Sequence, residues 1–161
     1  MLSNNYDQRL GSEAMTDTDQ KAAERQLLDL VGKELHFSGG LLGFPDCQRY
    51  KINRFDPGDG SDSPFFILES TDHNLSFTLI HPDLVVPDYE LPVSPELLSS
   101  LIAQSERELV AMLIVTVRDR VEDITVNLQG PLIINSISLR GLQLVVEEYP
   151  VRHPLLQTSA Q

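Results

Sequence analysis

The sequence contains no tryptophan, a single cysteine and no long hydrophobic run. One cysteine cannot form an intramolecular disulfide, so we interpret Cys47 as a packing residue in a reducing compartment. No apolar stretch reaches the roughly 20 residues that a membrane-spanning helix requires. The beginning of the chain, residues 1–20, lacks the basic and apolar regions of a secretory signal. We therefore expect a cytoplasmic protein that does not cross a membrane.

Basic residues are also scarce. The chain has 12 lysines and arginines against 24 aspartates and glutamates, which gives a formal charge of −12. A surface of this sign repels phosphate backbones and anionic lipid headgroups and attracts basic partners. The composition therefore predicts no direct binding to nucleic acid and no attachment to a membrane.

The sequence also lacks the local motifs of common enzymes. It has no Walker A loop, no Rossmann glycine fingerprint, no G-x-S-x-G elbow and no H-E-x-x-H. Its histidines are far apart, whereas structural zinc sites usually contain closely spaced ligand pairs. We predict no catalytic residues, no cofactor and no metal. An enzyme whose site gathers Asp123, His81 or His153 in one pocket remains an alternative.

A single domain is expected from the length of 161 residues. Residues 1–24 are polar and show no apolar periodicity, which is typical of a disordered leader. The folded domain is expected over residues 25–157, with a flexible tail at residues 158–161.

Within that domain, short apolar runs alternate with glycine, proline, asparagine and aspartate, the pattern of an all-β protein. The predicted strands are Leu27–Val31, Glu34–Phe37, Arg49–Arg54, Phe65–Glu69, Leu75–His81, Val110–Val117, Asp123–Leu128, Leu132–Ile134 and Gly141–Glu147. The run Val110–Val117 is apolar almost throughout, which predicts a strand buried on both faces.

One segment has the signals of a helix start. Ser94 can act as the N-cap, Pro95 suits the first helical position and Glu96 favours the positive end of the helix dipole. Ser105 and Glu108 have the spacing of a capping box, with room for a single turn. The sequence thus predicts an all-β fold: a small antiparallel β-barrel-like domain with one or two short helical turns.

Two polar segments are candidate binding sites. Period-two geometry places four polar residues of one predicted strand on the same face, where they form either a recognition row or an ordinary solvent face. These residues are Asp123, Thr125, Asn127 and Gln129. The loop Asp56–Asp62 resembles a calcium loop, but its twelfth position is Ile67 instead of a carboxylate, so we interpret it as an acidic turn.

Several motifs, taken in order, resemble the FliW family between about Leu28 and Leu156. The first is the turn FSGGLLGF at Phe37–Phe44, and the second is PFFILES at Pro64–Ser70. The strongest is VEDITVNLQGPLIIN at Val121–Asn135, followed by YPVRHPL at Tyr149–Leu155.

The resemblance implies a compact β-barrel that binds CsrA, a small basic RNA-binding regulator, and also binds flagellin. In that scheme flagellin held by FliW leaves CsrA free to repress flagellin mRNA, and secretion of flagellin releases FliW to sequester CsrA. The chain would then be a chaperone and translational regulator and not an enzyme.

Residues near the family-like turns, namely Asp46, Tyr50 and Asn135, join the polar row as candidate partner contacts. For Tyr50, a core aromatic position is the favoured reading. The alternatives are a structural flagellar component or a small-molecule-binding β-barrel enzyme.

Overall fold

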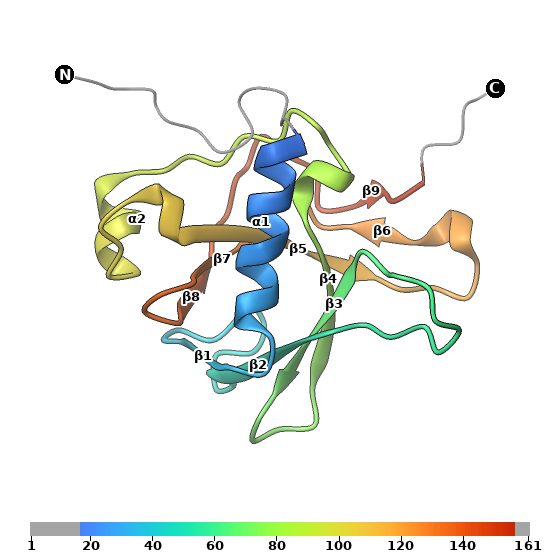
Figure 1. Ribbon diagram of the computed structural model, residues 1–161, viewed down its shortest axis with the longest axis horizontal. Helices are drawn as coiled ribbons and strands as arrows, with labels where there is room; N and C mark the ends of the chain where they lie inside the picture. The colour runs from blue at the N-terminus through green and yellow to red at the C-terminus, as the bar shows by residue number, and fades with distance from the viewer. Residues whose placement is uncertain (1–16, 157–161) are drawn as a thin grey trace.

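The computed structural model describes residues 17–156, with side chains described from Ala22 onwards. Its centre is a closed barrel of seven strands (Figure 1). The barrel strands are β1 (Glu34–Phe37), β2 (Arg49–Arg54), β3 (Phe65–Ser70), β4 (Ser76–Ile80), β5 (Leu109–Thr116), β7 (Leu132–Asn135) and β8 (Arg140–Gln143). They follow the order β4-β3-β2-β1-β8-β7-β5, and pairing of β4 with β5 closes the ring. The predicted all-β barrel is thus confirmed.

One pair in the barrel departs from the antiparallel arrangement expected from the sequence. β1 and β8 run parallel, with His36 opposite Arg140 and Phe37 opposite Gly141. Two short strands extend the sheet beyond the ring: β6 (Thr125–Val126) and β9 (His153–Pro154). The strand predicted at Asp123–Leu128 is therefore much shorter, because Asp123 belongs to the 3-10 turn η3 (Val121–Asp123).

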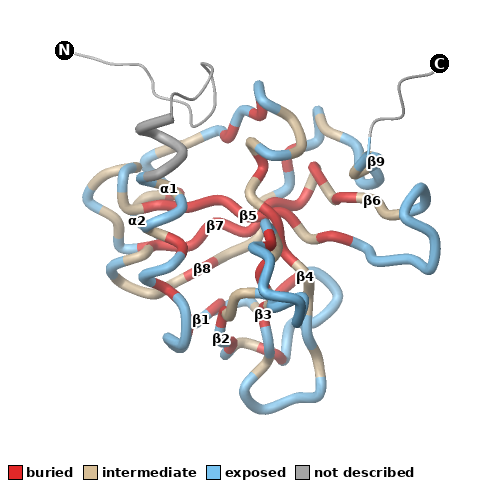
Figure 2. Tube along the Cα trace, turned by 45° about the vertical axis from the view of Figure 1, so that its right-hand side comes forward, coloured by how far each residue is buried: buried red, intermediate tan, exposed pale blue. Residues whose placement is uncertain are grey.

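Strand β5 explains why Val110–Val117 is apolar almost throughout. Its alternate residues Val110 and Met112 lie in the cluster that fills the barrel, while Leu109, Ala111 and Leu113 lie in a second cluster outside it. The outer cluster is covered by the 81–103 segment and by the C-terminal part of the chain. Figure 2 shows the buried positions concentrated along β5 and β7. Burial on both faces, as predicted, confirms β5 as the centre of the core.

The first described element is a helix, α1 (Asp17–Leu30), and not the predicted strand at Leu27–Val31. Leu27, Leu30 and Val31 have the spacing of one helix face, and Leu27 and Leu30 are buried in the barrel cluster. Residues 17–24, assigned to a disordered leader on composition, are helical in this structure. Burial of the two leucines supplies the stabilisation that the polar first turns lack. Residues 1–16 and 157–161 lie outside the described part of the chain.

Helix α1 lies across one mouth of the barrel (Figure 1). Gln26 Nε2 donates hydrogen bonds to Arg107 O, just before β5, and to Ser136 Oγ, just after β7, both at 3.0 Å. Glu24 forms an ion pair with Arg54 at the end of β2, at 3.7 Å. These contacts tie the helix to strand ends on both sides of the mouth.

The loop between β1 and β2 reaches the opposite end of the barrel. Leu42 N donates to Gln143 Oε1 at 2.8 Å, and Gln143 Nε2 donates to Gly130 O at 2.9 Å. Gly40 has a φ of 67°, and a Cβ there would overlap Phe44 O. The turn therefore requires glycine at this position.

The predicted helical turns are confirmed. Helix α2 (Pro95–Ser100) starts with Ser94 Oγ accepting from Leu97 N at 3.1 Å. The 3-10 turn η2 (Glu106–Glu108) starts with Ser105 as its N-cap, and a further 3-10 turn, η1 (Pro82–Leu84), follows β4. None of the helices between residues 17 and 156 is both long and apolar enough to cross a membrane.

Candidate functional site

The residues predicted to contact a partner differ in their exposure and belong to several elements. Asp46 is exposed in the β1–β2 loop and Asp123 is exposed in η3. Thr125 is half-buried in β6 opposite Pro154. Each of these three residues thus belongs to a different element: a loop, a 3-10 turn and a short strand.

The two amides of the predicted polar row hold the fold locally. Asn127 Oδ1 accepts from Gln129 N and Gly130 N, both at 2.9 Å, which closes the turn before β7. Gln129 Nε2 donates to Tyr149 O at 3.2 Å. Both side chains are half-buried, so the row is not a continuous free polar strip.

Tyr50 is fully buried inside the barrel and is not a surface residue. Its ring packs edge-on against Phe37, with 5.6 Å between centroids. Among the described residues its hydroxyl has no hydrogen-bond partner, and burial raises the pKa of Tyr50 to about 12. The alternative favoured from sequence, a core aromatic residue, describes its position.

Asn135 is also fully buried, which corrects its assignment as a partner contact. Its Nδ2 donates to Leu101 O at 2.8 Å and to Ile102 O at 3.2 Å. Its Oδ1 accepts from Ile137 N at 2.8 Å and from Ser138 N at 3.2 Å. One side chain thus fixes two turns, one after α2 and one between β7 and β8.

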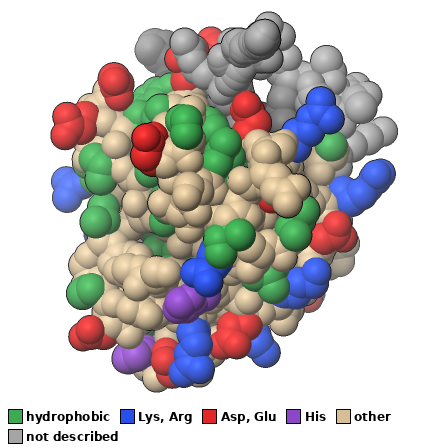
Figure 3. Space-filling view, turned by 90° about the vertical axis from the view of Figure 1, so that its left-hand side faces the viewer, with side chains coloured by type: hydrophobic (Ala, Val, Ile, Leu, Met, Phe, Trp, Pro, Cys, Tyr) green, Lys and Arg blue, Asp and Glu red, His purple; other side chains and the backbone are tan. Residues whose placement is uncertain are grey.

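Each of these turns presents an isoleucine to solvent. Ile102 is 60% exposed and Ile137 is 72% exposed. Ile102 has a φ of 52°, a left-handed conformation that is rare for a β-branched residue. Figure 3 shows the side of the molecule that carries α2, where hydrophobic side chains lie at the surface beside acidic ones. Strained backbone held by a buried network is often found at binding sites.

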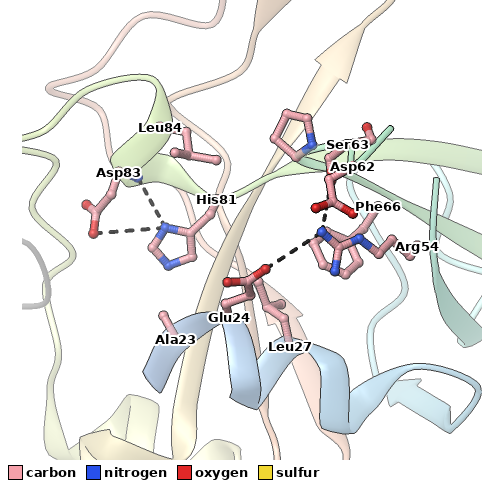
Figure 4. A pocket seen from close by; sticks show the side chains of 11 residues that line it. Ala23, Glu24, Leu27, Arg54, Asp62, Ser63, Phe66, His81, Asp83 and Leu84 are labelled. Atoms are coloured by element: carbon pink, nitrogen blue, oxygen red, sulfur yellow. Dashed lines mark hydrogen bonds and ion pairs between the residues drawn. The ribbon is translucent and has the colours of Figure 1, made fainter. Parts of the chain in front are cut away.

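Sequence reasoning missed a pocket of about 370 Å³ beside α1, at the same barrel mouth. Its lining comes from four separate segments: Ala23, Glu24 and Leu27; Arg54; Asp62, Ser63, Pro64 and Phe66; and His81, Asp83 and Leu84. Figure 4 shows His81 and Asp83 on one side and Arg54 with Phe66 on the other. No local motif spans these segments, so spacing in the sequence carries no signal of the pocket.

The two sides of the pocket differ in how their charges are matched. On one side, the Arg54 guanidinium lies 5.8 Å from the centroid of the Phe66 ring and pairs with Glu24. On the other side, His81 Nδ1 accepts from Asp83 N at 3.2 Å, so that nitrogen carries no proton in this arrangement. Burial lowers the pKa of His81 to about 4. Burial also raises the pKa of Asp83 above its ordinary value.

The pocket does not assemble the enzyme site considered from sequence. It contains His81, but Asp123 and His153 do not line it. Within residues 17–156, no group of three or more histidine, cysteine, aspartate or glutamate residues is placed to hold a metal ion. In the loop Asp56–Asp62, the Asp56 and Asp59 carboxylates accept from Gly58 N and Ser61 N, the arrangement expected of an acidic turn.

Comparison with known proteins places this barrel in one family. The sequence profile of the FliW protein family matches residues 16–155. A flagellar assembly factor FliW from Treponema denticola is 35% identical over 136 residues, covering 83% of this chain and 84% of that protein. The corresponding protein from Lachnoclostridium phytofermentans is 36% identical over 128 residues, covering 78% and 81%.

The fold comparison agrees. A crystal structure of the flagellar assembly factor FliW superimposes with a TM-score of 0.69 at 28% identity, covering 79% of this chain and 88% of that one. The family profile begins at residue 16, well before Leu28, where the sequence motifs first resembled it. Helix α1 is therefore part of the family domain. This chain belongs to the FliW family of flagellar assembly factors.

Proposed function

We propose that this protein regulates flagellin production by binding two proteins in turn, CsrA and flagellin. Bound to flagellin, it leaves CsrA free to repress flagellin mRNA. Released by flagellin secretion, it sequesters CsrA and relieves that repression. The observation that carries the proposal is membership of the FliW family along residues 16–155. The protein then acts in the cytoplasm by exchanging partners, without catalysing a reaction.

The charge of the chain supports a basic partner. A formal charge of −12 favours encounter with a basic regulator and disfavours contact with RNA. An acidic protein docked beside CsrA imposes steric and Coulombic penalties on RNA without occupying the RNA groove. We therefore expect antagonism to persist at saturating RNA. Displacement of the protein from CsrA by simple one-site competition with RNA would contradict this mechanism.

The structure narrows the residues to test as contacts. Of the sequence-predicted residues, Asp46 and Asp123 are exposed and Thr125 is half-buried, so these three stay candidates. Ile102 and Ile137 join them, because exposed apolar side chains on a fixed backbone suit a protein interface. Replacement of both isoleucines by serine is expected to weaken binding to a partner and to leave the melting temperature close to its original value.

Size-exclusion chromatography of the purified protein with CsrA, with flagellin, and with both together tests the proposal. Two binary complexes that exclude one another are expected. Failure to bind either protein at micromolar concentration would contradict the proposed function but not the description of the fold. Stable, stoichiometric association with isolated basal bodies would instead support a structural flagellar component.

A further inference from the structure

The pocket beside α1 contains a carboxylate, that of Asp83, for which the described residues supply no cationic partner. The Asp83 side chain is only 9% exposed. Among the described residues, the ionisable side chain that pairs with it is His81, whose Nδ1 lies 3.9 Å from Asp83 Oδ2. That nitrogen already accepts the Asp83 N–H, so it has no proton to donate to the carboxylate. A buried carboxylate in this situation is costly to the folded state unless a cation or donor pairs with it.

The other charges of the pocket do not supply that cation. Arg54 is committed to Glu24 at 3.7 Å and to Ser63 O at 3.4 Å, and its guanidinium lies over Phe66. Asp62, which is exposed and lies on the Arg54 side of the pocket (Figure 4), adds a second carboxylate for which the described residues supply no ion pair. The described lining residues therefore carry the carboxylates of Glu24, Asp62 and Asp83 against the single guanidinium of Arg54, and this excess of negative charge disfavours anionic ligands.

The walls of the pocket are partly apolar. Its lining includes the buried side chains of Leu27 and Phe66 and the side chain of Leu84, which is 58% exposed. Lysine and arginine side chains combine an aliphatic stem with a cationic head, so they match a cavity with apolar walls and a carboxylate. Arg54 already shows a cation held in this pocket, because its guanidinium lies over the Phe66 ring and pairs with Glu24.

We propose that this pocket receives a lysine or arginine side chain from a basic protein docked on the α1 mouth, with the cation against Asp83 and the stem against Leu84. The fit of a cationic side chain to this pocket depends only on the carboxylate and the apolar walls of the pocket. Only the assignment of the side chain to a docked protein rests on the proposed function. The helix that forms one wall, α1, would then belong to the recognition surface as well as to the core.

NMR titration of the 15N-labelled full chain tests the inference, with N-acetyl-arginine amide and N-acetyl-lysine amide as probes. Amide shifts are expected at the non-proline residues of the two lining segments 62–66 and 81–84. N-acetyl-citrulline amide, which is neutral, should not produce them. Asp83→Asn should lower the binding affinity of the cationic probes by about fivefold or more. Glu147→Gln, which removes the same charge from an exposed site outside the pocket, should leave their affinity unchanged.

Leu84→Ser provides a second variant, because it shortens the apolar wall without altering charge, and it should also weaken both probes. Equal effects of Asp83→Asn and Glu147→Gln, or shifts scattered over the acidic surface, would overturn the inference. Tighter binding of spermidine than of the amino-acid amides would reassign the pocket to a free polyamine. Chromatography of the same variants with CsrA and flagellin tests the proposed function separately. Complexes that form while the probes fail to bind would contradict only the pocket inference, whereas loss of both complexes in the wild type would contradict only the proposed function.

Discussion

The Asn135 amide donates a hydrogen bond to Leu101 O at 2.8 Å, across 34 residues of sequence. This bond joins the end of β7 to the turn after α2. The same side chain accepts from Ile137 N and Ser138 N. A single buried asparagine therefore holds both turns that expose an isoleucine.

Replacing this asparagine should be costly. Asn135→Ala leaves the Ile137 and Ser138 N–H groups without their acceptor and the Ile102 carbonyl without its donor, while Leu101 O keeps only its bond from Ser138 Oγ. We therefore expect a loss of about 3 kcal/mol in the free energy of unfolding. Urea denaturation measures the change. Asn127→Ala is the matched control, because Asn127 is only half-buried and should cost about 1 kcal/mol. Similar values for the two variants would contradict the role assigned to Asn135.

The hydroxyl of Tyr50, for which the described residues supply no hydrogen-bond partner, leads to the opposite expectation. Tyr50→Phe keeps the ring packed against Phe37 and removes a buried polar atom that has no partner among the described residues. We expect the free energy of unfolding to stay the same or to rise by about 1 kcal/mol.

Tyr89→Phe is the control for that experiment. Tyr89 is buried as well, but its hydroxyl donates to Leu128 O at 2.7 Å. Its removal should lower stability by about 1 to 2 kcal/mol. Comparable destabilisation in both tyrosine variants would show that the Tyr50 hydroxyl has a partner.

Burial of His81 predicts a pH dependence of stability. Its pKa falls from 6.5 to about 4 on folding, because burial disfavours the charged form. The unfolded chain therefore binds more protons between these two values, so stability is full above pH 6.5 and declines as the pH falls toward 4. The shift corresponds to about 3 kcal/mol.

His81→Asn isolates this contribution, because asparagine can still accept the Asp83 N–H as an N-cap. The pKa of Asp83 is raised in the folded state, so its protonation adds stability as the pH falls and opposes the effect of His81. The quantity to measure is the difference in unfolding free energy between wild type and variant at pH 7 and pH 4.5. A difference that does not change with pH would refute the assignment.

Two adjacent glycines in the β1–β2 loop give a matched pair. Gly40→Ala forces a side chain into a left-handed backbone and against Phe44 O and Pro45 Cα, so we expect a loss of about 2 kcal/mol or more. Gly39→Ala meets nothing within 4 Å and should change stability by less than about 0.5 kcal/mol. Thermal unfolding of both variants tests the difference. If Gly40→Ala proved as harmless as Gly39→Ala, the turn would not need glycine.

Much of the fold could be predicted from local patterns in the sequence. Alternation identified most of the barrel strands, and Ser94 with Pro95 marked the start of α2. The nearly continuous apolar run of β5 predicted a strand buried on both faces, and the two core clusters show why. These predictions succeed because strand period and helix capping depend on neighbours in sequence.

The first helix, α1, shows where prediction from local sequence was wrong. Leu27 to Val31 suits a strand by composition, and only the barrel mouth, which buries Leu27 and Leu30 together, selects the helix. The polar row failed for a related reason. Asn127 and Gln129 alternate with buried residues, as predicted, but their side-chain amides are already hydrogen-bonded. Asn127 Oδ1 accepts from Gln129 N within the turn, and Gln129 Nε2 donates to Tyr149 O, which lies 20 residues away in sequence.

The sequence by itself determined the fold class, the acidic character and the family resemblance, because these reside in composition, periodicity and motif order. Only the tertiary structure decided which polar residues are available to a partner. The sequence predicts Asn135 to be a surface residue, but in the structure it is buried between the end of β7 and the turn after α2. The pocket around Asp83 exists only because barrel closure brings four distant segments to one mouth. Burial and charge pairing are properties of that assembled environment, and no single stretch of the chain contains them.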